Sequence, residues 1–213
     1  DGTPGATLAS CTLSGLVNGD VVACTGSASF DTASAGTGKT VTASSLALTG
    51  LAAGNYTLSA TTATTTAAIT AVTVTPAVTA SDKPYDGTPG ATLASCTLSG
   101  VVSGDAVACI GTASFDTAGV GTGKTVTASS LALTGTAAGN YTLSTTSAAT
   151  TASITAVTVT PVVTAVDKPY DGTPGATLAS CTLSGLVNGD AVACTGTASF
   201  DTASAGTSKT VTV

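Results

Sequence analysis

Apolar and polar residues alternate along most of the chain, and threonine and valine fill many of the alternating positions. Period-two runs cover residues 40–48, 56–60 and 69–75. Successive side chains of a strand point to opposite faces, so these runs predict strands with one half-buried face. β-Branched residues also favour strands over helices, and no segment holds helical apolar spacing over three turns. Glycine-based turns such as Asn18-Gly19-Asp20 separate the runs. The sequence therefore predicts an all-β protein.

An internal repeat of 85 residues organises the chain. The segment Asp-Gly-Thr-Pro-Gly begins at Asp1, Asp86 and Asp171. Residues 1–85 and 86–170 are identical at 71 of 85 positions, and residues 171–213 differ from 1–43 at four positions. A unit of this length can bury a modest core of its own. We therefore expect tandem small domains of the β-sandwich or β-grasp-like kind, with an 85-residue period.

Two prolines suggest where the units meet. Pro76 and Pro161 each follow an alternating run, and proline is tolerated at a strand start or edge but not inside a ladder. This division gives a unit lacking its first strand (1–75), a complete unit (76–160) and a partial unit (161–213). We expect a longer array, or neighbouring copies, to complete both ends.

Short joints between units are expected to limit bending, with the rings of the repeated Pro-Tyr-Asp-Gly turn packed at the joint. The residues assigned to the joints are Pro76, Pro84, Tyr85, Asp86, Gly87, Pro161, Pro169, Tyr170, Asp171 and Gly172.

Large core residues are scarce, so alanine and threonine methyl groups must fill much of each interior. The candidates in the first unit are Leu8, Val22, Phe30, Val41, Leu46, Leu48, Tyr56, Leu58 and Ile69.

Each unit carries one pair of cysteines that could staple this thin core. The segment 10–24 resembles a hairpin, in which opposed residues have a constant index sum, and Cys11 and Cys24 satisfy the sum for a centre between Val17 and Asn18. Opposed Cα atoms in non-hydrogen-bonded pairs lie ~4.5 Å apart, within reach of a disulfide, and closing such a loop stabilises by roughly 3 kcal/mol. Free buried thiols and bridges between neighbouring chains are the alternatives. The predicted pairs are Cys11–Cys24, Cys96–Cys109 and Cys181–Cys194.

Composition removes several classes of function. The chain contains no Glu, Gln, Arg, His, Met or Trp, which excludes histidine-based catalysis and bidentate arginine clamps. A net charge of -6 argues against nucleic-acid binding, and no run approaches the ~20 apolar residues of a membrane-spanning helix. Disulfides would indicate an oxidising compartment. A low-complexity, glycosylated stalk is the alternative to folded domains.

Several ordered segments resemble a known family. They are Asp82-Lys-Pro-Tyr-Asp-Gly-Thr88, Ser99-Gly-Val-Val-Ser-Gly-Asp105, Ala113-Ser-Phe-Asp116, Gly121-Thr-Gly-Lys-Thr-Val-Thr127, Leu133-Thr-Gly135 and Gly139-Asn-Tyr-Thr-Leu143. Together they resemble the YDG repeat of bacterial surface adhesins and secreted filamentous exoproteins, a relative of the MBG repeats. The resemblance spans the whole period and implies a small β-rich domain, repeated on an extracellular stalk, without catalytic residues. The cysteine pair and the alanine richness depart from the family pattern.

Other candidate chemistry has an ordinary structural interpretation beside it. Four aspartates near turns could either bind calcium or simply form the turns, and no loop has the D-x-D-x-D spacing of a calcium site. They are Asp82, Asp86, Asp105 and Asp116. Three lysines each sit just before a Thr-Val-Thr strand, where they could form an isopeptide cross-link to Asp or Asn or a simple ion pair. Thr-x-Thr arrays such as Thr73-Val-Thr75 could order water as an ice-binding face, or they could be ordinary exposed strands. The three lysines are Lys39, Lys124 and Lys209.

We predict a non-enzymatic structural repeat protein, secreted or on a bacterial cell surface, that forms a stalk or fibre without cofactors. Its expected partners are other copies of the repeat, in a longer array or a homopolymer assembled by strand complementation. A sugar- or ice-binding surface module is the alternative.

Overall fold

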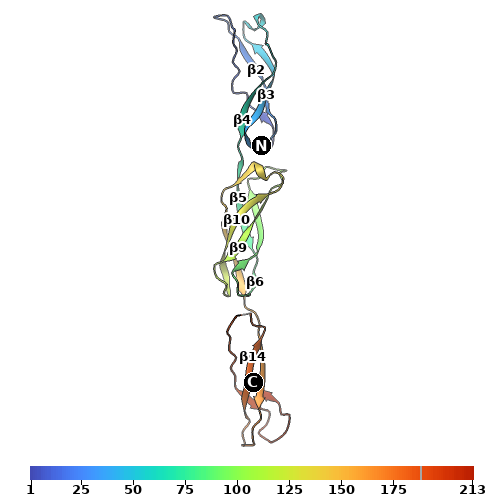
Figure 1. Ribbon diagram of the computed structural model, residues 1–213, viewed down its shortest axis with the longest axis vertical. Coiled ribbons are helices and arrows are strands. Elements are labelled where there is room, and N and C mark those ends of the chain that lie inside the picture. Colours follow the sequence, from blue (N-terminus) through green and yellow to red (C-terminus); the bar gives the residue numbers. More distant parts are fainter. Residues whose placement is uncertain (188) are drawn as a thin grey trace. The chain divides into compact units, whose positions relative to one another are not determined.

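The computed structural model describes residues 1–187 and 189–213 (Figure 1). It is all-β, as predicted, and its described helical residues lie in two short 3-10 turns, η1 (Ala53–Asn55) and η2 (Ala138–Asn140). The chain forms two compact parts. The first comprises Asp1–Val78, Ser95–Thr112 and Ser129–Ala148, and the second comprises Thr79–Ala94, Ala113–Ala128 and Ala149–Val213.

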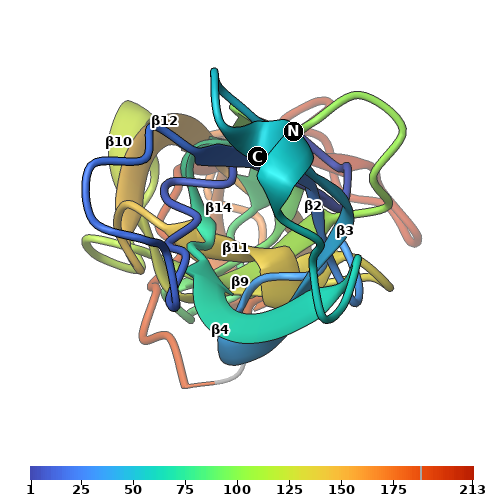
Figure 2. The same cartoon turned by 90° about the horizontal axis from the view of Figure 1, so that it is seen from above.

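The first repeat unit is built on one antiparallel sheet. Its strands run in the order β1 (Gly5–Ala6), β2 (Ala23–Phe30), β3 (Gly36–Thr49) and β4 (Ala63–Ile69). Figures 1 and 2 show β2, β3 and β4 side by side. Val41 and Ala43 of β3 are buried, whereas the other core candidates of this unit are half-buried.

The second repeat unit distributes its strands over two sheets. One sheet has the order β11-β5-β8 and the other the order β6-β12-β10-β9-β7. Two of the pairings, β5 with β11 and β6 with β12, are parallel. The strands are β5 (Val72–Ala80), β6 (Lys83–Pro84), β7 (Gly90–Ala91), β8 (Leu93–Ser99), β9 (Ala108–Phe115), β10 (Gly121–Thr134), β11 (Tyr141–Leu143) and β12 (Ala148–Thr155).

A small apolar cluster lies within this second unit. Phe115, Val126, Ala152 and Ile154 are nearly inaccessible to solvent, and the partly buried Tyr85 packs against them. Among the described residues, no charged side chain is buried, and Tyr141 is the one buried side chain with a polar group. The cluster contains a single large aromatic ring, in keeping with the thin core that the composition predicts.

The third repeat unit contains β13 (Thr160–Val166), β14 (Gly175–Ser184), β15 (Ala198–Phe200) and β16 (Val211–Thr212), in that order. All three pairings are antiparallel. The ladder between β13 and β14 shifts its register between Thr164 and Ala165.

The prolines chosen as unit limits do not interrupt strands. Pro76 is buried within β5, and Pro161 lies within β13 opposite Leu183. Pro76 is tolerated because Val74 is the last residue of β5 to pair with β11. Backbone N–H groups of alternate residues in a strand point to the same neighbour, so the nitrogen of Pro76 points to the β11 side, as that of Val74 does. Because β11 has ended there, the lack of an N–H at Pro76 costs no ladder hydrogen bond. The limits at 75/76 and 160/161 stay predictions.

Within the described residues, the structure has no helix of the length and apolar character required to cross a bilayer.

Candidate functional site

One disulfide lies in each repeat unit. The bonds join Cys11 to Cys24, Cys96 to Cys109 and Cys181 to Cys194. These are the pairs expected from the sequence, and the paired Cα atoms lie 5.6, 5.4 and 5.5 Å apart. Every cysteine of the chain therefore has an intramolecular partner.

The surroundings of the disulfide differ from the expected hairpin. Cys96 lies on β8 and Cys109 on β9, and these strands belong to different sheets. The constant index sum predicted the correct cysteine partners. However, the chain that follows β8 enters β9 of the other sheet and does not pair with β8 as a hairpin would. In the second unit the bond therefore ties two sheets together.

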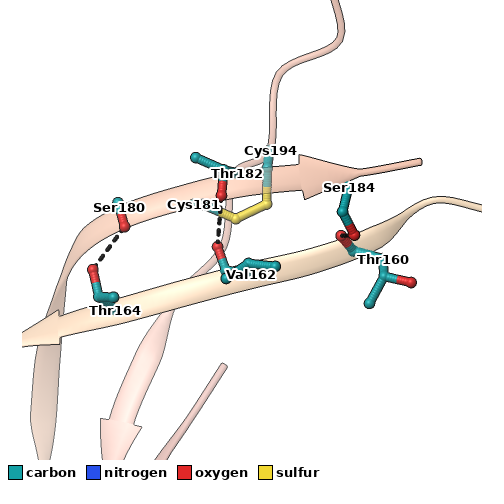
Figure 3. Close-up of a disulfide and its surroundings, with 8 residues drawn as sticks. All are labelled: Thr160, Val162, Thr164, Ser180, Cys181, Thr182, Ser184 and Cys194. Atoms are coloured by element: carbon teal, nitrogen blue, oxygen red, sulfur yellow. Dashed lines mark hydrogen bonds between the residues drawn. A yellow bond between two sulfur atoms is a disulfide. The ribbon is translucent and has the colours of Figure 1, made fainter. Parts of the chain in front are cut away.

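Cross-strand hydroxyl groups flank the disulfide in the third unit (Figure 3). Thr164 and Ser180 hydroxyl oxygens are 2.6 Å apart, and the Thr182 hydroxyl donates to the Val162 carbonyl at 3.3 Å. In the second unit the Thr97 hydroxyl makes the same bond to the Ala77 carbonyl, also at 3.3 Å. Threonine thus supplements the backbone ladder beside the covalent staple.

The repeated Lys-Pro-Tyr-Asp-Gly-Thr segment is held by a lysine–aspartate pair. Lys83 Nζ lies 2.7 Å from Asp86 Oδ1 and donates to the Thr88 carbonyl at 2.8 Å. Asp86 Oδ1 also accepts from the Thr88 backbone N–H at 2.9 Å. The Lys83 ammonium, followed by the Thr88 bonds, lowers the pKa of the Asp86 carboxyl to about 2. Lys168, Asp171 and Thr173 repeat this arrangement.

A second ion pair stands at each of the three lysines that precede a Thr-Val-Thr strand. Lys39 Nζ lies 3.1 Å from Asp31 Oδ1, and Lys124 Nζ lies 3.0 Å from Asp116 Oδ1. Lys209 and Asp201 form the third such pair. The hydrogen bond to Lys39 holds the pKa of the Asp31 carboxyl below its usual range. The lysines considered for isopeptide cross-links are thus ion-paired.

In the first and second units, a tyrosine fixes the Gly-Asp turn that follows the first cysteine. Tyr141 is buried, and its Oη donates to Asp105 Oδ2 at 2.5 Å while accepting from the Val102 N–H at 3.0 Å. Burial and the hydrogen bond to Asp105 raise the pKa of Tyr141. In the first unit, Tyr56 makes the equivalent bonds to Asp20 and Val17.

Two further polar contacts connect residues of successive units. In the first compact part, the Ala35 backbone N–H donates to Asn140 Oδ1 at 2.9 Å. In the second compact part, Tyr85 Oη donates to Asp190 Oδ1 at 3.0 Å. The hydrogen bond to Asp190 raises the pKa of Tyr85.

The remaining joint residues have distinct positions. Pro84 is the second residue of β6 and lies opposite Thr155 of β12. Pro169 and Tyr170 line a hollow of about 430 Å³ in the third unit, and Tyr170 is 71% exposed. In the second unit, β12 pairs with β6 at Lys83, which holds the same position of the period as Lys168. Gly87 and Gly172 have positive φ values of 76° and 75° in the tyrosine turn.

The other chemical candidates are engaged in local structure. Asp82 Oδ1 accepts from the Ser153 backbone N–H at 2.6 Å, and Asp86, Asp105 and Asp116 have the partners described above. Among the described residues, no group of three Asp, Glu, His or Cys is placed to hold a metal ion. Thr73 is exposed on β5, 3.4 Å from the Thr142 hydroxyl on β11.

Reasoning from the sequence missed the functions of Asn140, Asp190 and Lys83. The repeat could have pointed to all three residues, because each belongs to a segment that recurs every 85 residues. Contacts between residues 105 positions apart, such as Tyr85 with Asp190, cannot be read from local spacing.

The comparisons with known proteins agree with this repeat organisation. A family model described as the YDG domain matches residues 1–67, 65–149 and 150–213. Searches of curated proteins and of solved structures found no match.

Proposed function

Since the chain belongs to the YDG domain family, in three successive segments, we propose that it is a non-enzymatic structural array that forms part of an extracellular stalk or fibre. The observation that carries this proposal is the recurrence of one disulfide-closed β unit along a single chain. Units joined in series bear the same tension, and a covalent staple limits how far each can extend when its sheets separate.

The disulfides also support the proposed location. They persist in oxidising compartments and are rare in reducing ones, and the apolar cluster of the second unit is small, so a covalent staple would add to its stability. We place the array outside the cytoplasm, secreted or on a bacterial cell surface, as the family resemblance implies.

The engagement of the reactive side chains supports a structural function over catalysis. Lys83 and Asp86 hold a turn, while Tyr141 and Asp105 hold another. General acid–base catalysis needs a group free to exchange a proton with a substrate, whereas these groups are committed to partners in their own unit.

The chain would also associate with other copies, by adding strands to their sheets and not by forming disulfides between chains. All six cysteines are paired within the chain, which favours a continuous chain over a polymer linked by disulfides. Within the chain, the short strand β11 pairs in parallel with β5, with Tyr141 opposite Val72. A strand of one copy would pair in the same way with a short edge strand of another copy.

Immunogold labelling of intact producing cells with antibodies to the repeat tests the proposed location. We expect label on the cell surface or on shed filaments, removed when intact cells are treated with a broad-specificity protease. Label confined to the cytoplasm of lysed cells would refute the extracellular stalk. Sedimentation over a range of concentrations tests association separately, and a strictly monomeric chain would reject strand addition between copies.

A further inference from the structure

Each compact part contains residues from both sides of one unit boundary. The first part includes the first unit together with segments 95–112 and 129–148 of the second. The second part includes segments 79–94 and 113–128 of the second unit together with the third unit. The two boundaries can therefore be examined independently, each within its own part.

At the boundary in the first part, the amide of Asn140 reaches the preceding unit. Its Oδ1 accepts from the Ala35 N–H at 2.9 Å in a partly buried bond. A Cβ placed on Gly2 would lie 3.7 Å from Val102 Cγ1. A side chain at Gly2 would therefore be in van der Waals contact with Val102 of the following unit.

At the boundary in the second part, the tyrosine of the Tyr-Asp-Gly segment reaches the following unit. Tyr85 Oη lies 3.0 Å from Asp190 Oδ1. A Cβ placed on Gly87 would lie 3.3 Å from Val187 Cγ1. A larger residue at Gly87 would need the valine to move, and its φ of +76° is in any case unfavourable for other residues.

The glycine–valine contact is the same at both boundaries. Gly2 and Gly87 occupy one position of the 85-residue period, and Val102 and Val187 occupy another. Its recurrence in two separately described parts indicates a contact encoded by the repeat. Apart from Ala35, which contributes only its backbone N–H, the residues involved belong to three recurring segments: Tyr-Asp-Gly, the turn ending in Gly-Asp, and Gly-Asn-Tyr.

We propose that these three segments form a head-to-tail docking surface whose partner is the adjacent repeat unit, with Tyr85–Asp190 and Ala35–Asn140 as its polar contacts. The docking surface fixes the orientation of neighbouring units, where a flexible linker would leave them free to swing. This inference builds on the proposed stalk function. Its test measures only the boundary, so either proposal can fail without the other.

The carboxylate of the Gly-Asp turn can accept hydrogen bonds from two tyrosines, one through each oxygen. Asp105 accepts from Tyr141 of its own unit through Oδ2. Asp190, at the same position of the period, accepts from Tyr85 of the preceding unit through Oδ1. Within an array, one carboxylate would thus join the internal support of a turn to the docking of the unit before it.

Hydrogen exchange at the Ala35 amide tests the first polar contact in the full chain. Asn140→Ala removes the acceptor, and we expect exchange about three- to tenfold faster, the effect of losing one hydrogen bond. The matched control is Asn55→Ala, because Asn55 is the exposed residue at the same position of the first unit. Ala35 exchange that is equal in wild type and Asn140→Ala would overturn this contact.

Distances between spin labels test the second contact. Non-cysteine labels at the exposed positions Thr151 and Ala179 report across the boundary. Tyr85→Phe deletes only a hydroxyl group, and we expect the distance distribution to broaden, whereas Tyr170→Phe should leave it unchanged. A distribution that is already broad in wild type, or that is the same in wild type and Tyr85→Phe, would overturn the fixed docking. Melting curves and intact disulfides verify that each variant is folded.

Discussion

Cys96 and Cys109 lie on strands of different sheets, with their Cα atoms 5.4 Å apart. A bond in this position resists separation of the two sheets directly, whereas a bond along a hairpin would only support a ladder that already exists. The mechanical and thermal behaviour of the unit should therefore depend on this pair.

Reduction, or replacement of Cys96 and Cys109 together by serine, should destabilise the second unit by roughly 3 kcal/mol, because the unfolded chain regains the freedom of a loop spanning 13 residues. Urea denaturation followed by circular dichroism measures the change. The far-ultraviolet spectrum at low temperature should stay the same. Equal midpoints with and without reductant would show that the bond does not stabilise the native state.

Stretching single molecules should reveal the segment hidden behind the bond. With the disulfide intact, the residues between Cys96 and Cys109 cannot extend. Reduction should lengthen the unfolding step of a unit by about 4 nm, the reach of that segment at roughly 3.4 Å per residue. The Cys96→Ser, Cys109→Ser variant should show the long step without reductant. Steps of one length under both conditions would contradict the staple.

Acid should weaken the Tyr-Asp-Gly turn. The folded pKa of Asp86 is about 2, below its ordinary value of 3.8, so the contribution of the charged carboxylate is complete above pH 4 and is lost as pH falls towards 2. Carboxyl carbon NMR titration measures the pKa directly. In Lys83→Met it should rise towards 3.8, since Lys83 is the main cause of the depression. An unmoved pKa in that variant would assign the depression to the Thr88 bonds instead.

Removing the Tyr141 hydroxyl should cost about 1–3 kcal/mol, because the Val102 N–H and the Asp105 carboxylate both lose a partner. Chemical denaturation of Tyr141→Phe measures the loss. Tyr170→Phe is the matched control, since that ring is 71% exposed, and its effect should lie within about 0.5 kcal/mol. Similar values for the two variants would remove Tyr141 from the support of the turn.

Gly135 should not tolerate a side chain. It has a φ of +107°, and a Cβ there would collide with the Ala106 carbonyl oxygen. Gly135→Ala should destabilise by about 1–3 kcal/mol through backbone strain, with the clash in addition. Gly139→Ala serves as the control, because a Cβ at Gly139 meets open space. Thermal melting compares the pair, and equal midpoints would contradict this interpretation.

The period, the strand class and the cysteine partners could be predicted because they depend on local pattern. The assignment of β8 and β9 to different sheets could not, since any connection of that length that returns the chain satisfies the same index sum. Pro76 was misleading because its tolerance within β5 depends on where β11 ends, which is a property of a strand more than sixty residues away. The partner of Tyr85 depends likewise on how successive units meet.

The ion pairs have a consequence for persistence. Trypsin-like enzymes cut after lysine or arginine by drawing the side chain into an acidic pocket, and this chain has five lysines and no arginine. All five ammonium groups are held by aspartates, with side-chain exposures of 11–26%. Lys83 and Lys168 are also followed by proline, which makes the bond a poor substrate. A folded array would therefore present almost no accessible cleavage site to proteases of this specificity.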